Sequence, residues 1–149
     1  MFMNPPNFIT KPGKILVIDD NPIIQRTMYF ALRDAGYAVV MCGDVTESLN
    51  RVREERPVLI LMDLNFPFDG SVVSPVTRDG FWALGWLQRF SEAKGAQFIV
   101  ISGDPPEKSR DRALACGAAA YFQKPINKRE LIATVDRLLG HAPPESGKP

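Results

Sequence analysis

The stretch VLILMD, residues 58–63, decides the fold. Its first five residues are apolar and do not alternate with polar ones, which is typical of a strand buried on both faces of a parallel sheet. The acidic residue that follows, Asp63, is therefore expected at the carboxyl edge of that sheet. In open α/β folds this edge is where ligands bind. The stretch predicts a central strand that delivers a carboxylate to a ligand-binding edge.

Three other apolar runs also end in polar residues. They are ILVI at 15–18 before Asp19 and Asp20, FIVI at 98–101 before Ser102, and AAYFQ at 119–123 before Lys124 and Pro125. Because the carboxyl ends of parallel strands meet at one edge of a sheet, these side chains are expected to converge with Asp63. Three carboxylates, a hydroxyl and an ammonium in one small area are the main functional signal in this chain.

Strands and helices are predicted to alternate along the whole chain. The predicted strands are residues 14–18, 37–41, 58–62, 97–101 and 119–123, and the predicted helices are 23–34, 44–55, 80–94, 105–117 and 127–139. Asp44 and Glu47 have the spacing of a capping box at the start of the second helix. This alternation predicts an α/β protein with a parallel sheet and right-handed crossovers.

Composition limits the domain organisation and the class of protein. The 149 residues fit one domain, 45% apolar content supports a core, and the net charge of +1 gives no sign of nucleic-acid binding. Cys42 and Cys116 have no CxxC partner and are expected to be free thiols. No segment resembles a signal sequence or a membrane span, so a cytoplasmic protein is expected. Residues 1–13 and 140–149 are predicted to be a flexible arm and a disordered tail.

The segment that follows the central strand is unusual. Residues 65–79 contain two prolines and a glycine, and they are too many for an ordinary connection between a strand and a helix. On the helix that follows, Trp82 and Trp86 are four residues apart and therefore neighbours. A packed aromatic pair is expected there in preference to a ligand platform.

The acidic group suggests a metal site. Asp19, Asp20 and Asp63 would repel one another unless a cation lay between them, and oxygen ligands at a strand edge suit Mg²⁺. The simpler alternative is that Asp19 and Asp20 only cap the following helix. Ser102 and Lys124 supply the hydroxyl and ammonium that hold the oxygens of a transferring phosphoryl group. Singly, they would be an ordinary helix cap and an ordinary surface lysine.

With these residues in place, the chain resembles a response-regulator receiver domain over residues 14–139. The motifs that carry the resemblance are IDD at 18–20, MDLNFP at 62–67, ISGD at 101–104 and GAAAYFQKP at 117–125. The resemblance implies a flavodoxin-like, doubly wound five-stranded parallel sheet with strand order 2-1-3-4-5 and five helices. Against this pattern, residues 68–78 form an insert between the third strand and the third helix. The insert is expected to shield the site or to supply partner specificity.

The resemblance also implies a role for each site residue. Asp63 would be the phosphoacceptor, and Asp20 and Asp63 would ligate Mg²⁺ directly. Asp19 would act mainly through water, and the backbone carbonyl of Asn65 would complete the set of protein ligands. Ser102 would supply the hydroxyl that moves toward the phosphoryl group, and Lys124 would supply the positive charge opposite that group. Tyr121 would be the aromatic residue that changes position in the switch. The Lys124–Pro125 bond is expected to be cis, aiming the lysine inward.

The implied function is that of a single-domain response regulator. A sensor histidine kinase or a histidine phosphotransfer protein would donate the phosphoryl group, and the added charge would switch a protein-interaction face. Such a domain is a two-state regulator rather than an enzyme with a diffusible substrate. The output is expected to be contact with an unknown protein, without nucleic acid or membrane. Ala120 stands where an acidic residue often supports dimers in the family, so a monomer is expected.

Two other functions remain open on the sequence. A hydrolase of the haloacid type also uses an aspartate nucleophile with Mg²⁺, but it needs a second aspartate two residues later. Asn65 follows Asp63 at that spacing, and Asn21 follows Asp19, so the acid–base group is missing in both places. A pseudo-receiver that acts only as an interaction module is the third possibility, and the complete acidic set argues against it.

Overall fold

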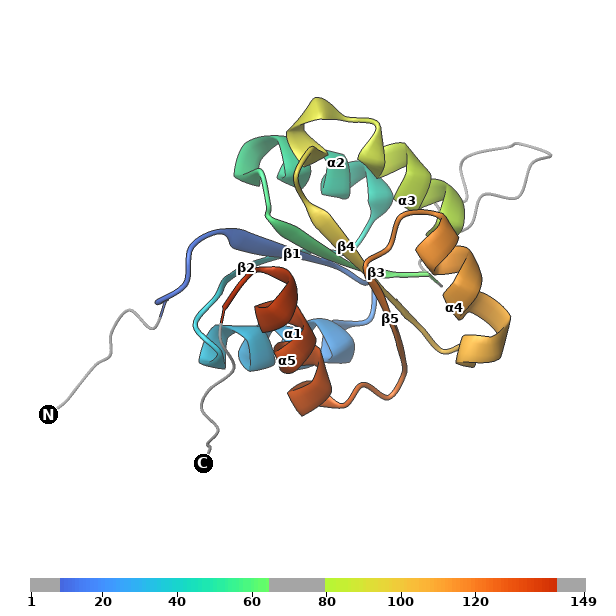
Figure 1. The fold of residues 1–149 in the computed structure, drawn as a ribbon. Coiled ribbons are helices and arrows are strands. Elements are labelled where there is room, and N and C mark those ends of the chain that lie inside the picture. Colours follow the sequence, from blue (N-terminus) through green and yellow to red (C-terminus); the bar gives the residue numbers. More distant parts are fainter. Residues whose placement is uncertain (1–8, 65–79, 142–149) are drawn as a thin grey trace, which may run out of the picture.

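The computed structural model describes residues 9–64 and 80–141, apart from the side chain of Val45. These residues form five parallel strands in the order β2-β1-β3-β4-β5, which confirms the predicted fold class (Figure 1). The strands are β1 Lys14–Ile18, β2 Ala38–Cys42, β3 Leu59–Asp63, β4 Gln97–Ser102 and β5 Ala120–Gln123. The helices are α1 Pro22–Asp34, α2 Val45–Glu55, α3 Gly80–Gln88, α4 Pro106–Ala115 and α5 Lys128–Leu138, with a short 3₁₀ turn at Ser91–Ala93.

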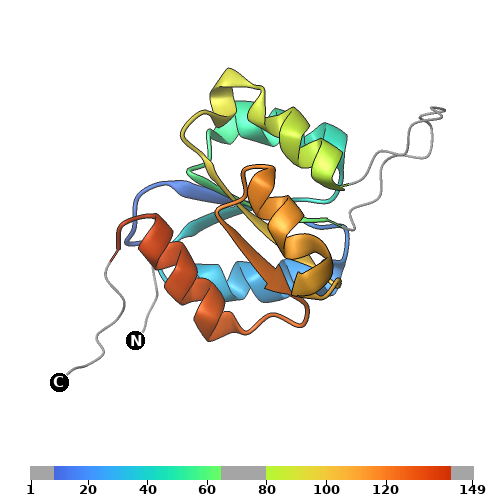
Figure 2. The same cartoon turned by 45° about the vertical axis from the view of Figure 1, so that its right-hand side comes forward.

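The sheet lies between two layers of helices (Figures 1 and 2). Alternate residues of each central strand face opposite layers. Val17 and Leu61 pack with Met28 of α1 and Leu131 of α5, whereas the residues next to them in the strands pack against α2, α3 and α4. All five residues of β3 are buried. This double burial explains why the apolar run at 58–62 does not alternate.

Strand pairing brings the carboxyl ends of the strands to one edge. Asp63, the last residue of β3, lies opposite Ile101 of β4, and Ser102 lies opposite Gln123 of β5. The ladder also continues one step beyond the strands, since the N–H of Lys124 donates to the carbonyl of Ser102 at 2.8 Å. The predicted convergence of polar side chains therefore follows from the register of the sheet.

Element ends differ from the prediction by one or two residues, with one larger exception. The predicted helix 80–94 ends at Gln88, because Phe90 adopts an extended backbone. Its ring makes a T-shaped contact with Trp86, with centroids 5.2 Å apart, and lies beneath the guanidinium of Arg53. Trp82 and Trp86 stack at 5.7 Å, which confirms the predicted aromatic pair.

The helix α3 begins directly against the chain that leaves β3. A Cβ on Gly80 would lie 2.3 Å from the carbonyl oxygen of Leu64, so no larger residue fits without moving the backbone. The chain therefore leaves the described part at Leu64 and rejoins it at Gly80 with the two backbones in contact. The predicted insert at 68–78 lies outside the described residues.

The predicted arm and tail are anchored where the structure describes them. The N–H groups of Thr10 and Lys11 donate to the carbonyl of Gly36, each at 3.0 Å. The ammonium of Lys11 pairs at 3.0 Å with Asp136, a residue of α5 that is only 1% exposed. The N–H of His141 donates to the carbonyl of Asp136. The described ends of the chain are therefore held together on α5, and residues 1–8 and 142–149 lie outside the described part.

Two further predictions concern cysteine and the membrane. Cys42 and Cys116 are free thiols, as predicted; Cys42 is buried and Cys116 is half-buried. Burial, together with the neighbouring carboxylates of Glu47 and Asp44, raises the pKa of the Cys42 thiol to about 12. This thiol is therefore protonated at neutral pH and is a poor nucleophile. Among the described residues, no helix has the length and apolar character needed to cross a membrane.

Candidate functional site

Three carboxylates meet at the carboxyl edge of the sheet. Carboxylate oxygens of Asp19, Asp20 and Asp63 lie within 4.8 Å of one another. Asp19 and Asp63 are 2% and 3% exposed, whereas Asp20 is exposed to solvent. This arrangement leaves one open side, where a cation could keep part of its water shell. Asn65, whose carbonyl was predicted as a further ligand, lies outside the described residues.

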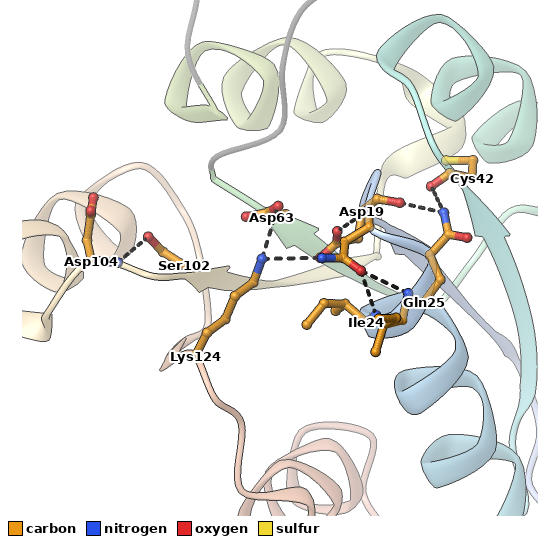
Figure 3. Close-up of polar contacts among 10 residues, drawn as sticks. Asp19, Ile24, Gln25, Cys42, Asp63, Ser102, Asp104 and Lys124 are labelled. Carbon is orange, nitrogen blue, oxygen red and sulfur yellow. Dashed lines mark hydrogen bonds and ion pairs between the residues drawn. The ribbon is translucent and has the colours of Figure 1, made fainter.

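The ammonium of Lys124 lies between the two buried carboxylates (Figure 3). Its Nζ is 3.2 Å from Oδ2 of Asp63 and 3.5 Å from Oδ2 of Asp19. The Lys124–Pro125 peptide bond is cis, as predicted. Lys124 is therefore not an ordinary surface lysine, because its charge is directed into the acidic cluster.

The carboxylate of Asp19 lies in an environment that disfavours its negative charge. Burial is the main cause that raises the pKa of Asp19 above its ordinary value, and the charge of Asp63 adds to it. The N–H of Asn21, which donates to Oδ1 of Asp19 at 2.8 Å, and the charge of Lys124 act in the opposite direction. The carboxylates of Asp19, Asp20 and Asp63 together offer several hard oxygen ligands in one place. Such ligands are the kind that Mg²⁺ prefers.

The helix-cap alternative is not supported, because another residue caps α1. Oδ1 of Asn21 accepts hydrogen bonds from the N–H groups of Ile23 and Ile24 at 2.8 and 3.3 Å. Asp19 receives the N–H of Asn21 instead. The sequence did not identify Asn21 as the cap, although asparagine before a proline-initiated helix is a common cap signal.

Ser102 and Tyr121 are linked through one loop residue, Asp104. The N–H of Asp104 donates to Oγ of Ser102 at 2.9 Å, and its carbonyl accepts a hydrogen bond from the hydroxyl of Tyr121 at 2.6 Å. Ser102 is fully buried and Tyr121 is half-buried. The Asp104 carboxylate accepts a hydrogen bond from the hydroxyl of buried Ser109 at 2.9 Å, and this bond fixes the loop between β4 and α4. Sequence reasoning identified Ser102 and Tyr121 but missed Asp104 and Ser109.

Sequence reasoning also missed Gln25, a residue of α1 next to the acidic cluster. Its side-chain amide donates to the backbone carbonyls of Asp19 and Cys42 (Figure 3). No charge or motif marks this glutamine in the sequence. Its partners are main-chain atoms, so only the packing of α1 against the ends of β1 and β2 reveals the contact.

Comparison with known proteins assigns the family. The family model of the response regulator receiver domain matches residues 15–136. The chain is 26% identical over 131 residues to the polar-differentiation response regulator DivK of Brucella anthropi, covering 88% of this chain and 99% of that protein. The match spans nearly the whole length of both proteins.

Solved structures agree with the sequence comparison. The chemotaxis response regulator CheY4 of Vibrio cholerae superposes with a TM-score of 0.71 at 27% identity, covering 86% of this chain and 99% of that one. The receiver domain of the sensor histidine kinase PA1611 from Pseudomonas aeruginosa PAO1 superposes with a TM-score of 0.71 at 25% identity, covering 87% and 99%. That structure holds a magnesium ion coordinated in its active-site cleft. From its fold, its polar edge and these matches, the chain belongs to the response regulator receiver domain family.

Proposed function

We propose that this protein acts as a response regulator whose receiver domain accepts a phosphoryl group on Asp63. The observation that carries the proposal is the setting of Asp63: it ends the central strand, is 3% exposed, and lies 3.2 Å from the ammonium of Lys124. The two acidic residues after β1 share the same small space. The donor is the phosphohistidine of a sensor histidine kinase or of a histidine phosphotransfer protein.

The chemical step is a transfer between two protein side chains. An oxygen of Asp63 attacks the phosphorus, the bond between phosphorus and the histidine nitrogen breaks, and the electron pair leaves with the imidazole. The oxygens of the transferring group carry negative charge, which the ammonium of Lys124 stabilises. The buried hydroxyl of Ser102 lies at the end of the neighbouring strand and serves as a hydrogen-bond donor to the new phosphoryl group.

The carboxylates of Asp19, Asp20 and Asp63 would hold Mg²⁺. The bound ion would supply the positive charge that lets an anionic donor approach an anionic acceptor. Asp20, the exposed member, is proposed as a direct ligand with Asp63, whereas Asp19 acts mainly through water. The backbone carbonyl of Asn65 is proposed as a further ligand.

The new charge biases a switch. Phosphorylation adds about −1.5 to −2 of charge beside Ser102, which favours a position of its hydroxyl closer to Asp63. That movement competes with the hydrogen bond from Asp104 to Ser102, and Asp104 is in turn bonded to Tyr121. A movement of Ser102 would therefore alter the contact between Asp104 and Tyr121, and with it the surface of β5. In this proposal the protein is a regulatory phosphoacceptor, with no enzymatic turnover except loss of its own phosphoryl group.

Incubation with acetyl phosphate and Mg²⁺ tests the proposal. The intact protein is expected to gain the mass of one phosphoryl group, and removal of Mg²⁺ with a chelator is expected to prevent the gain. The Asp63→Asn variant is expected to gain none, because an amide is not a nucleophile toward phosphorus. Labelling of Asp63→Asn as complete as that of the unchanged protein would show that the phosphoacceptor is another residue.

Magnesium is expected to stabilise the folded protein, and Asp20 is expected to carry most of the effect. At an ion concentration 100 times the dissociation constant, binding adds about 2.7 kcal/mol to the free energy of unfolding. The Asp20→Ala variant loses a direct ligand and should lose nearly all of that gain, whereas Asp19→Ala should lose less. Thermal unfolding with and without Mg²⁺ measures both. An equal gain in Asp20→Ala and in the unchanged protein would argue against the shared site.

The output is proposed to be contact with another protein rather than pairing with a second copy. Basic side chains of α4 already have partners within the chain: Lys108 lies 3.8 Å from the carboxylate of Asp104, and the guanidinium of Arg112 lies 3.9 Å from the ring centre of Phe81. Ala120 offers no carboxylate to a second copy. The expected partners are therefore a phosphoryl donor in the cytoplasm and a downstream protein, without nucleic acid or membrane.

Sedimentation with beryllofluoride and Mg²⁺, which imitate the phosphoryl group, tests the state of assembly. The protein is expected to remain a monomer with and without these ions, because exposed ion pairs contribute at most about 1 kcal/mol each. A tight dimer that disappears when Lys108 or Arg112 is replaced by alanine would contradict this expectation.

A further inference from the structure

The side-chain amide of Gln25 joins three elements at the acidic edge. Gln25 lies in the first turn of α1, and its Nε2 donates to the carbonyl oxygen of Asp19 and, at 3.2 Å, to that of Cys42 (Figure 3). The carbonyl of Cys42 also accepts the N–H of Asp19 at 3.1 Å. One half-buried amide group therefore fixes the ends of β1 and β2 relative to α1.

The bond to Asp19 has a particular consequence for the carboxylates. The carbonyl that Gln25 contacts belongs to the peptide group between Asp19 and Asp20, and a peptide group is planar. The Cα atoms of both aspartates lie in this plane. Holding the carbonyl oxygen in place therefore fixes the positions from which both side chains extend. Asp19 is further restrained by the N–H of Asn21, whereas Asp20 is exposed. The direction of the Asp20 carboxylate depends most on this plane.

We propose that Gln25 is a positioning residue for the magnesium site, acting through the Asp19–Asp20 peptide group. The inference rests on the proposed function, since it assumes that these carboxylates hold Mg²⁺. Gln25 does not touch the ion or the phosphoryl group. Its two N–H donors keep Asp20 oriented before the ion arrives, so less order has to be gained on binding. Partners that orient metal ligands typically change metal affinity by about 10- to 100-fold when they are removed.

Gln25→Met is the test variant, because methionine has a similar length and no N–H donor. The matched control is Gln97→Met. Gln97 is also half-buried, and its Nε2 also donates to a backbone carbonyl, that of Leu138 at 2.7 Å. That bond lies at the start of β4, at the opposite end of the sheet. The two variants therefore lose the same kind of hydrogen bond, and only one of them loses it beside the carboxylates.

Titration calorimetry with Mg²⁺ alone gives the first measurement. The dissociation constant is expected to rise about tenfold in Gln25→Met and to stay unchanged in Gln97→Met. In phosphorylation by acetyl phosphate, Gln25→Met is expected to need about ten times more Mg²⁺ for half the maximal rate, with a maximal rate close to that of the unchanged protein. A general loss of structure would lower the maximal rate as well.

The outcomes separate this inference from the proposed function. Unchanged Mg²⁺ affinity in Gln25→Met, or an equal loss in Gln97→Met, would overturn the role of Gln25 while leaving the magnesium site intact. If the unchanged protein bound no Mg²⁺, or if Asp20→Ala bound it equally well, the proposed site itself would fall, and the inference with it.

Discussion

Replacement of Lys124 by methionine is expected to slow phosphorylation of Asp63 by about 10²- to 10³-fold. This is the usual effect of removing one preorganised hydrogen-bond donor that stabilises negative charge in a transition state. The ammonium lies 3.2 Å from Asp63 and 3.5 Å from Asp19. Methionine keeps the length and apolar stem of the side chain but loses the charge. The rate of phosphorylation by acetyl phosphate at saturating Mg²⁺ measures the effect.

The same substitution is expected to change magnesium binding in the opposite direction. In the free protein, Lys124 partly neutralises the carboxylates that would hold the ion, so its removal leaves more negative charge for Mg²⁺. Affinity should rise while the rate falls. Lys128→Met, which removes an exposed lysine of α5, is the control and should alter neither quantity. An unchanged rate in Lys124→Met would show that this ammonium does not act in the transfer.

Replacement of Lys11 by methionine is expected to reduce the free energy of unfolding by about 3 kcal/mol, because it leaves a buried carboxylate without its counter-charge. Oδ1 of Asp136 accepts a hydrogen bond from the ammonium of Lys11 at 3.0 Å and another from the hydroxyl of Tyr37. Oδ2 is buried and has no hydrogen-bond partner within residues 9–64 and 80–141. The Lys11 ammonium also lies 4.8 Å from the ring centre of Tyr37.

Lys14→Met is the matched control. Lys14 pairs with Glu55 at 2.6 Å, but its side chain is 48% exposed, so its loss should cost less than about 1 kcal/mol. Chemical unfolding of the two variants at neutral pH measures the difference. Equal losses would mean that Asp136 does not depend on Lys11.

The Asp136 cluster also predicts alkaline sensitivity. Burial, followed by the hydrogen bond to Asp136, raises the pKa of the Tyr37 hydroxyl above its ordinary value of 10.0. A group whose pKa is raised by folding contributes stability that is complete below its unfolded pKa and is lost as the pH rises through the folded value. The stability that depends on Tyr37 should therefore be intact up to about pH 10 and fall above it. A Tyr37→Phe variant should lack this component of the pH dependence.

Most of the fold and the centre of the candidate site could be predicted because both depend on local sequence pattern. An apolar run that ends in a polar residue fixes the strand and the edge to which its last side chain is delivered. Asp19, Asp63, Ser102 and Lys124 were all located in this way. The strand order came from resemblance and not from the pattern alone, because alternation of strands and helices does not distinguish one parallel order from another.

The residues that were missed make contacts that no local sequence pattern marks. Asp136 lies 99 residues from Tyr37 and 125 from Lys11, so its burial cannot be inferred from the helix that contains it. Gln25 binds backbone carbonyls, which leave no trace in the sequence. The end of α3 at Gln88 was missed for a related reason: helical spacing continues to Phe90, but the ring of Phe90 lies beneath the guanidinium of Arg53 in α2, a contact that the local sequence does not show.

The position of the phosphoryl group is the most direct test of the account. Borohydride reduces an aspartyl phosphate to the alcohol, so the modified residue becomes homoserine and can be located by peptide mass spectrometry. After treatment with acetyl phosphate and Mg²⁺, homoserine is expected at position 63 and at no other aspartate, including Asp19 and Asp20. Homoserine at another position, with Asp63 intact, would contradict the central claim.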